Sequence, residues 1–149
     1  MPSAASVRLL LVTPALDSAA REGRFGSAPH CPGHPGLSGL DTGAWAGRTL
    51  AEVAAEDPAA VRRWLTDPAY APPGGESVAA LTDRVGAALA GLGEGRHRLP
   101  VEQAVVRAAV VHALELPHAA FWRLDVRPET VTELTGRSGR WNLRLGRPE

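Results

Sequence analysis

The order of apolar and polar positions along the chain predicts strands that alternate with helices. Residues 7 to 12 are apolar apart from Arg8, which is typical of a strand buried on both faces. After Ser77, apolar residues recur at the spacing of one helix face, at Val78, Leu81, Val85, Leu89 and Leu92. A second apolar face runs from about Gln103 to Leu114, and Pro117 ends it. These patterns predict one buried strand near the start and two buried helices in the second half.

Two shorter helices are predicted by their start signals. Thr49 and Glu52 have the spacing of a capping box. Asp57 precedes Pro58, and proline is favoured at the first position of a helix. By contrast, the stretch from Gly26 to Gly39 is dense in glycine, proline and serine, which indicates a loop.

The last third of the chain changes to the two-residue period of strands. Residues 130–134 and 141–145 alternate, and glycines mark the segment 136–139 between them, which predicts a C-terminal β-hairpin. A chain of 149 residues is expected to form one domain, residues 1–149. Strands alternating with helices before a hairpin predict an α/β fold, a three-layer sheet with flanking helices.

Composition and charge exclude several classes of function. Sixteen basic residues balance sixteen acidic ones, so no broad positive field favours nucleic acid or an anionic membrane. All the basic residues are arginine, which excludes mechanisms that need a lysine. The single cysteine, Cys31, excludes an internal disulfide, and no apolar run reaches the roughly 20 residues of a membrane helix. We therefore expect a cytoplasmic protein that binds neither nucleic acid nor membrane.

Three motifs together resemble a known family. They are Asp41-x-Gly43-x-Trp45-x-Gly47, the segment Pro-Pro-Gly-Gly-Glu-Ser at 72–77 and the segment Phe-Trp-Arg-Leu-Asp-Val at 121–126. The chain resembles the histidine phosphatase superfamily, with its phosphoglycerate-mutase-like fold, from Val7 to Leu145. This resemblance implies a pocket in which enzymes of the family transfer a phosphoryl group to a histidine.

The residues that the family's reaction needs are replaced after the first strand. The resemblance implies Arg-His-Gly at the positions of Thr13, Pro14 and Ala15. A neutral imidazole can attack phosphorus, and an adjacent arginine offsets the phosphate charge. Proline can do neither, so the resemblance implies that the nucleophile is absent.

Two further catalytic positions also differ. The resemblance places Glu102 where a second histidine stands, shortly before Arg107, and places Gly39 where the general acid stands. A carboxylate at position 102 would repel a phosphate dianion. Because loss of one member of such a catalytic unit costs a rate factor on the order of 10⁴ to 10⁶, we expect no phosphatase or mutase activity.

The segment between Phe25 and Asp41 is shorter than the resemblance implies. Family members carry a strand and a helix there, whereas this chain has only a loop rich in glycine and proline. One sheet element is therefore expected to be missing, which leaves a neighbouring strand as an exposed edge or covered by a partner. Pro100 is expected to interrupt the strand at 97–101, because proline is poorly tolerated in a central strand.

Two classes of function remain open. The first is a binding or regulatory pseudoenzyme, whose exposed sheet, or an exposed Trp64 or Trp141, holds a protein partner or another copy of the chain. The second is a repurposed enzyme that performs acid-base chemistry on a small molecule with Asp17, Glu102 and Glu76. Fold alone does not decide between them.

The remodelled pocket is expected to contain Thr13, Pro14, Ala15, Ser18, Arg21 and Arg107. In a repurposed enzyme Thr13 and Ser18 would supply hydroxyl groups. Arg21 or Arg107 could retain affinity for a phosphate ester. The carboxylates also have structural interpretations, because Asp17 could cap a helix and Glu76 could fix the loop before a helix.

A possible metal site occurs in the loop. His30, Cys31 and His34 bring imidazole and thiolate groups together, and both groups suit zinc. Their spacing matches no standard zinc pattern, so they are equally explained as incidental loop residues. We predict no metal and no cofactor.

Overall fold

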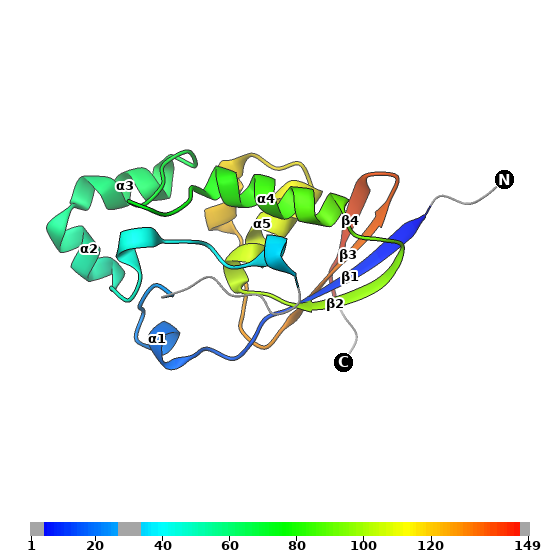
Figure 1. Cartoon of the computed structure of the whole chain (residues 1–149), viewed down its shortest axis with the longest axis horizontal. Coiled ribbons are helices and arrows are strands. Elements are labelled where there is room, and N and C mark those ends of the chain that lie inside the picture. The colour runs from blue at the N-terminus through cyan, green and yellow to red at the C-terminus, as the bar shows by residue number, and fades with distance from the viewer. Residues whose placement is uncertain (1–4, 27–33, 147–149) are drawn as a thin grey trace.

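The computed structural model describes residues 5–26 and 34–146, and within them the sheet has four strands in the order β2-β1-β3-β4 (Figure 1). Strand β1, Ser6–Val12, pairs in parallel with β2, Gly95–Pro100. On its other side β1 pairs antiparallel with β3, Val131–Arg137, and a tight turn leads to β4, Arg140–Arg144. The α/β class, the early strand and the C-terminal hairpin are confirmed.

The helices begin where the capping residues predict. Helix α2 is Leu50–Glu56 and helix α3 is Pro58–Thr66; α1, Ser18–Arg21, is a single turn. Thr49 Oγ1 accepts a hydrogen bond from the backbone N–H of Glu52 at 3.1 Å, and Asp57 Oδ1 accepts one from the N–H of Ala60 at 3.1 Å. These bonds satisfy backbone donors that a helix start leaves unpaired.

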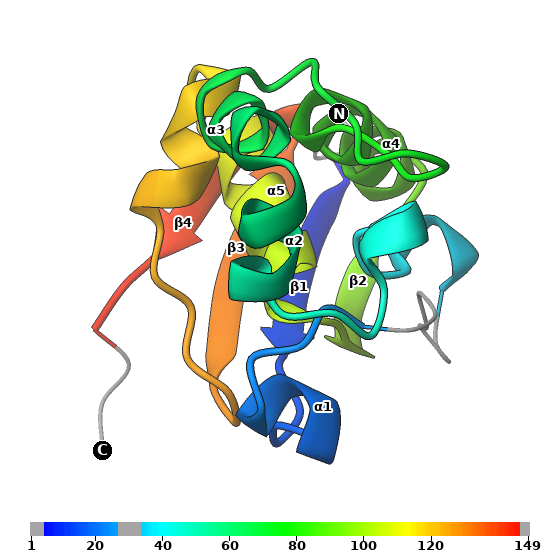
Figure 2. The ribbon, with the colours of Figure 1, turned by 90° about the vertical axis from the view of Figure 1, so that its left-hand side faces the viewer.

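The main core lies between one face of the sheet and two helices. Helix α4, Val78–Ala90, and helix α5, Gln103–Ala113, lie side by side over this face (Figures 1 and 2). Leu9 and Leu11 of β1 and Leu134 of β3 are each 0% exposed beneath them. Burying such side chains stabilises a fold by about 1.5–3 kcal/mol each, so this interface anchors the domain.

A second, smaller core lies around α2 and α3. Trp45, in the 3-10 turn Gly43–Trp45, packs edge-on against Trp64 of α3 with 5.4 Å between ring centroids. Trp64 is only 6% exposed, and Trp141 of β4 is half-buried against the main core. The idea of a partner surface built on an exposed Trp64 or Trp141 is therefore wrong.

The opposite face of the sheet is open. Residues paired across neighbouring strands point to the same side. On the side away from α4 and α5 they include Arg8, Leu10, Arg96, Arg98, Glu133 and Arg144. Figure 1 shows the helices that cover the sheet on the other side. The flanking helices are confirmed, but in the described part of the chain they cover one face, so the expected third layer is incomplete.

Strand β2 forms an edge of this sheet. Within residues 5–26 and 34–146 its outer side pairs with no other strand, as the shortened loop predicts. Pro100 is the last residue of β2 and stays paired in register with Val12. The predicted interruption does not occur, because an edge strand tolerates the missing N–H of proline. In the same part of the chain, every helix is too short or too polar to cross a bilayer.

Candidate functional site

A pocket of about 320 Å³ lies where the parallel strands β1 and β2 both end. Ligand sites of α/β folds form at this end of parallel strands, since the connecting loops converge there. The walls come from the segment after β1, the start of α5, helix α3 and the 3-10 helix His118–Arg123, which is η3. Segments that are distant in the sequence thus enclose one cavity.

The end of β1 presents Pro14 and Ala15 to the pocket. Thr13 is 2% exposed, and its hydroxyl donates to the carbonyl of Arg127 at 2.7 Å. The same hydroxyl accepts from the backbone N–H of Thr130 at 3.0 Å. Thr13 therefore ties β1 to the start of β3 rather than lining the cavity.

Glu102 reaches the pocket from the residue before α5. Its carboxylate lies directly over Gly39, where a Cβ on residue 39 would overlap it. The absence of a side chain at position 39 is what makes room for the carboxylate. The two positions that the sequence singled out are therefore in contact, although they lie far apart in the sequence.

Asp17 lines the same pocket but has a structural task. Its Oδ1 accepts a hydrogen bond from the backbone N–H of Ala20 at 2.8 Å, which caps α1. The helix-capping interpretation of Asp17 is confirmed. Ser18 and Arg21, on α1, are exposed and lie outside the residues that line the cavity.

Two arginines add positive charge to the pocket. Arg107 is half-buried, and its Nε donates to the carbonyl of Leu124 at 2.7 Å. Burial lowers the pKa of this guanidinium, and the nearby charge of Asp125 partly offsets that effect. Arg24 pairs with Glu22 at 3.0 Å, and this hydrogen bond is the main reason that its pKa is raised. Both arginines remain cations at neutral pH.

Aromatic side chains form much of the remaining wall. Trp64 meets Trp122 of η3 edge-on at 4.5 Å between centroids, and Phe25 meets Trp64 at 5.5 Å. Two buried polar atoms of the lining, Trp64 Nε1 and Thr42 Oγ1, have no hydrogen-bond partner within the described residues. Such atoms are uncommon in native interiors and are paired when a ligand or water supplies the partner.

Comparison with known proteins decides the family. The model of the histidine phosphatase superfamily (branch 1) matches residues 23–147, which is most of the chain. The chain belongs to the histidine phosphatase superfamily.

Solved structures share the fold of this histidine phosphatase superfamily member. The α-ribazole phosphatase of Shigella flexneri superposes with a TM-score of 0.78 at 17% identity, covering 93% of this chain and 95% of that one. The mycobacterial glucosyl-3-phosphoglycerate phosphatase in complex with VO₃ superposes with a TM-score of 0.76 at 19% identity, covering 93% and 97%. At these identities the likeness shows the fold alone.

A short stretch also matches curated proteins. It is 60% identical over 37 residues, or 25% of this chain, to the bifunctional protein Rv2228c of Mycobacterium tuberculosis and to an uncharacterised protein of Mycobacterium bovis. The chain spans about a tenth of the length of these relatives, since the match covers 10% of each.

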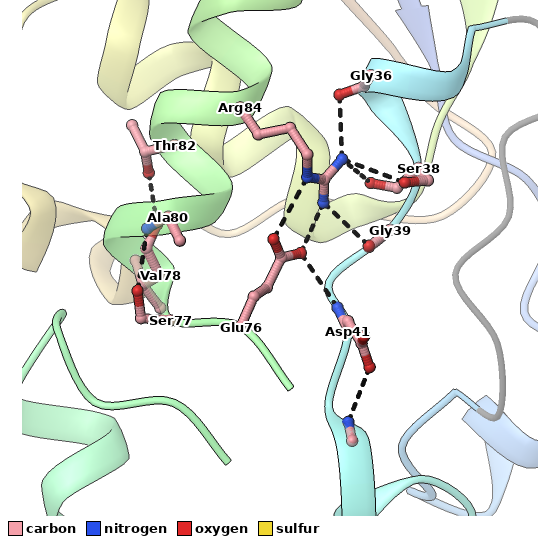
Figure 3. A network of polar contacts seen from close by, with 11 residues as sticks. Gly36, Ser38, Gly39, Asp41, Glu76, Ser77, Val78, Ala80, Thr82 and Arg84 are labelled. Atoms are coloured by element: carbon pink, nitrogen blue, oxygen red, sulfur yellow. Dashed lines mark hydrogen bonds and ion pairs between the residues drawn. The ribbon is translucent and has the colours of Figure 1, made fainter. Parts of the chain in front are cut away.

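Glu76 of this superfamily member is held away from the pocket by Arg84 of α4. Figure 3 shows the pair, in which Arg84 Nη2 donates to Glu76 Oε1 at 2.6 Å. The same guanidinium donates to backbone carbonyls of the loop 36–39, and Glu76 accepts from the N–H of Asp41 at 3.2 Å. Glu76 therefore fixes the loop that carries Gly39, which agrees with its structural interpretation and leaves it outside the pocket lining.

Sequence reasoning missed several residues of the pocket. Arg24, Thr42 and Trp64 line it but were not among the predicted site residues. Trp64 had a usable signal, because it follows Ala60 and Val61 at helical spacing on the buried side of α3. Arg24 and Thr42 lie in irregular segments, where no periodic pattern indicates the direction of a side chain.

Most of the possible metal site falls outside the described residues. His30 and Cys31 belong to that segment, so their arrangement is left undescribed. His34 Nδ1 accepts a hydrogen bond from the backbone N–H of Gly36 at 3.0 Å and caps a short 3-10 turn. Among residues 5–26 and 34–146, no group of three or more histidine, cysteine, aspartate or glutamate side chains is placed to hold a metal ion.

Proposed function

We propose that this chain is a binding or regulatory pseudoenzyme of the histidine phosphatase superfamily, one that binds in the old pocket but transfers no phosphoryl group. The observation that carries the proposal is the identity of three side chains at the pocket: Pro14 and Ala15 after β1, and Glu102 before α5. The resemblance implies a histidine at positions 14 and 102. The proposal places the protein in the cytoplasm, where Cys31 would stay reduced.

Charge supports the loss of phosphoryl chemistry. A phosphate in this pocket would meet the carboxylates of Glu102 and Asp17, whose charges oppose those of Arg107 and Arg24. Like charges within about 4–6 Å disfavour each other strongly, so a dianion gains little there. Removing a nucleophile-base unit costs a rate factor on the order of 10⁴ to 10⁶, which leaves no useful turnover.

The shape of the pocket supports retained binding. A cavity of about 320 Å³ with aromatic walls fits a small organic molecule. Trp64 Nε1–H offers a buried donor, and Thr42 Oγ1 offers a buried hydroxyl that can donate or accept. A neutral or zwitterionic ligand with a carbonyl or hydroxyl group would satisfy both atoms.

Release of inorganic phosphate from a panel of phosphomonoesters tests the proposal. We expect the wild-type protein to release no more phosphate than the Pro14→Gly variant, whose residue 14 has no side chain. Unfolding curves of both proteins show that the comparison is between folded molecules. Turnover of any ester that depends on protein concentration and exceeds that of the variant would overturn the proposal.

The alternative is a repurposed enzyme with carboxylate acid-base chemistry. One observation favours it: Asp17 and Glu102 line the same pocket, as that hypothesis requires. Glu76 takes no part in it, because Arg84 holds this carboxylate away from the lining. If an activity on a phosphate-free substrate is found, Asp17→Asn and Glu102→Gln should each abolish it. An activity that survives both substitutions excludes these carboxylates as acid and base.

A further inference from the structure

The open face of the sheet carries a concentration of arginine that the neutral charge of the chain conceals. We call it the arginine face and define it by Arg8, Leu10, Arg96, Arg98, Glu133 and Arg144. Four of these six residues are cations and one is an anion, whereas the whole chain has a formal net charge of zero. The positive charge is thus gathered on one side of the sheet.

The single carboxylate leaves much of this charge uncompensated. Glu133 accepts from Arg8 at 3.0 Å and from Arg144 at 2.9 Å, so both of its oxygens are engaged. These bonds hold the pKa of Glu133 below its ordinary value, so it stays ionised. Arg96 and Arg98 are exposed on β2 and have no ion-pair partner within the described residues. They are therefore available to an external anion.

An apolar floor lies between the cations. Leu10 is only 4% exposed, yet it belongs to neither hydrophobic core, because its cover comes from its neighbours on this face. Leu145, just after β4, is 82% exposed beside it. Together with Arg8, Arg96 and Arg144 these leucines line a hollow of about 500 Å³. A floor of this kind favours an occupant that has an apolar side as well as negative charge.

Protection against aggregation, a second copy of the chain and single-stranded nucleic acid each fit the arginine face less well. Charged residues on an edge strand such as β2 prevent aggregation, but Arg8 lies on the inner strand β1 and gains nothing from that role. A second copy docked face to face would oppose arginine with arginine. Single-stranded nucleic acid binds by stacking on aromatic rings, and no aromatic residue of β1 to β4 points to this side.

We propose that the arginine face docks an acidic amphipathic helix of a partner protein. Such a helix would supply the missing layer of the sheet: its apolar side would cover Leu10 and Leu145, and its carboxylates would pair with Arg96 and Arg98. A helix in a groove with charged flanks is a common mode of recognition. The surface lies apart from the pocket, so the docking is independent of the proposed ligand.

Fluorescence anisotropy with a labelled peptide tests this docking. The probe is a helical peptide of about 18 residues, with leucines at helical spacing and glutamates along both flanks. A matched peptide with glutamine in place of glutamate measures the charge contribution. The variant Arg96→Glu/Arg98→Glu removes the free cations, and Arg62→Glu/Arg123→Glu makes the same charge change at exposed arginines outside the sheet.

We expect the wild-type protein to bind the acidic peptide about tenfold or more tightly than the glutamine peptide. Reversal of Arg96 and Arg98 should weaken binding by about tenfold or more, and the control variant should change it less than about twofold. Unfolding curves of both variants verify that they are folded, and Glu102→Gln should bind like wild type, which separates this result from the pocket.

Three results would each overturn the proposal. The first is equal peptide affinity of Arg96→Glu/Arg98→Glu and the control variant, or no binding at all. The second is tighter binding of an oligothymidylate than of the acidic peptide, which would make the face a nucleic-acid surface. The third is sedimentation as a dimer that only the Arg96→Glu/Arg98→Glu variant loses, which would make a second copy the occupant.

Discussion

The carboxylate of Glu102 occupies the space that a side chain at Gly39 would need. In the superfamily resemblance, position 39 carries an acid and position 102 a histidine. In this chain the acidic group has thus moved to the opposite wall of the same pocket. Substitutions that look like two separate losses in the sequence are one coupled rearrangement in space.

This coupling predicts the effect of Gly39→Ala. The new methyl group must displace the Glu102 carboxylate, which we expect to cost about 1–2 kcal/mol of unfolding free energy. In a Glu102→Ala background the same substitution should cost less than about 0.5 kcal/mol, because the obstacle is gone. Urea unfolding of the double-mutant cycle measures the difference. Gly93→Ala, at a glycine with open space around it, serves as the control. Equal costs in both backgrounds would show that the contact is not real.

Arg84 should be among the most important polar residues for stability. Arg84→Met leaves the carboxylate of Glu76 without its cation and removes the donors to the loop carbonyls of Gly36, Ser38 and Gly39. We expect a loss of about 2–3 kcal/mol, since the pair is largely shielded from water. Arg62→Met on the exposed side of α3 should change stability by less than about 0.5 kcal/mol. Urea unfolding that gave similar values for both would contradict the structural role of the pair.

Thr13 should matter for stability and not for chemistry. Thr13→Val removes the hydroxyl that accepts from the N–H of Thr130 and leaves that donor unpaired at a site where Thr13 is 2% exposed. The expected cost is about 1–2 kcal/mol in thermal or urea unfolding. Thr66→Val, which removes an exposed hydroxyl bonded to the carbonyl of Arg62, is the matched control and should cost less than about 0.5 kcal/mol. If the two variants unfold alike, Thr13 does not tie β1 to β3.

Glu133 predicts a dependence of stability on pH. The hydrogen bonds from Arg144 and then Arg8 lower the pKa of this carboxyl in the folded state. Its stabilisation is therefore present above the ordinary carboxyl pKa of about 4.3 and is lost as the pH falls through the lowered folded value. Urea midpoints measured between about pH 7 and about pH 3 should fall more for wild type than for Glu133→Gln. Glu94→Gln, at an exposed glutamate, should follow wild type; a Glu133→Gln profile that also followed wild type would show that the ion pairs do not form.

The parts of the fold that sequence could predict depend on near neighbours in the chain. Thr49, Asp57 and Ser77 each cap a helix three residues ahead, so a window of a few residues contains the whole signal. The same holds for the apolar stripe of α4 and for the turn of the hairpin. Position along β2 was less well predicted, because the pairing of Pro100 with Val12 joins distant segments.

The candidate site could be predicted only as far as motifs reach. Pro14, Ala15, Asp17, Glu102 and Arg107 were placed at one pocket by resemblance, and all of them line it. No local pattern indicates that Glu102 lies over Gly39 or that Glu76 turns to Arg84. Nor does composition reveal the arginine face, since a balanced count of charges says nothing about where the register of a sheet collects them.

Binding of phosphate and vanadate to the folded protein tests the central claim most directly. A ligand at about 100 times its Kd stabilises a protein by about 2.7 kcal/mol, so weak binding is visible as a rise in the unfolding midpoint. The account predicts no saturable rise for the wild-type protein with either anion, because Glu102 and Asp17 oppose the charge of Arg107 in the pocket. A saturable rise that Arg107→Gln abolishes would contradict it and show that the pocket still accepts a phosphoryl group.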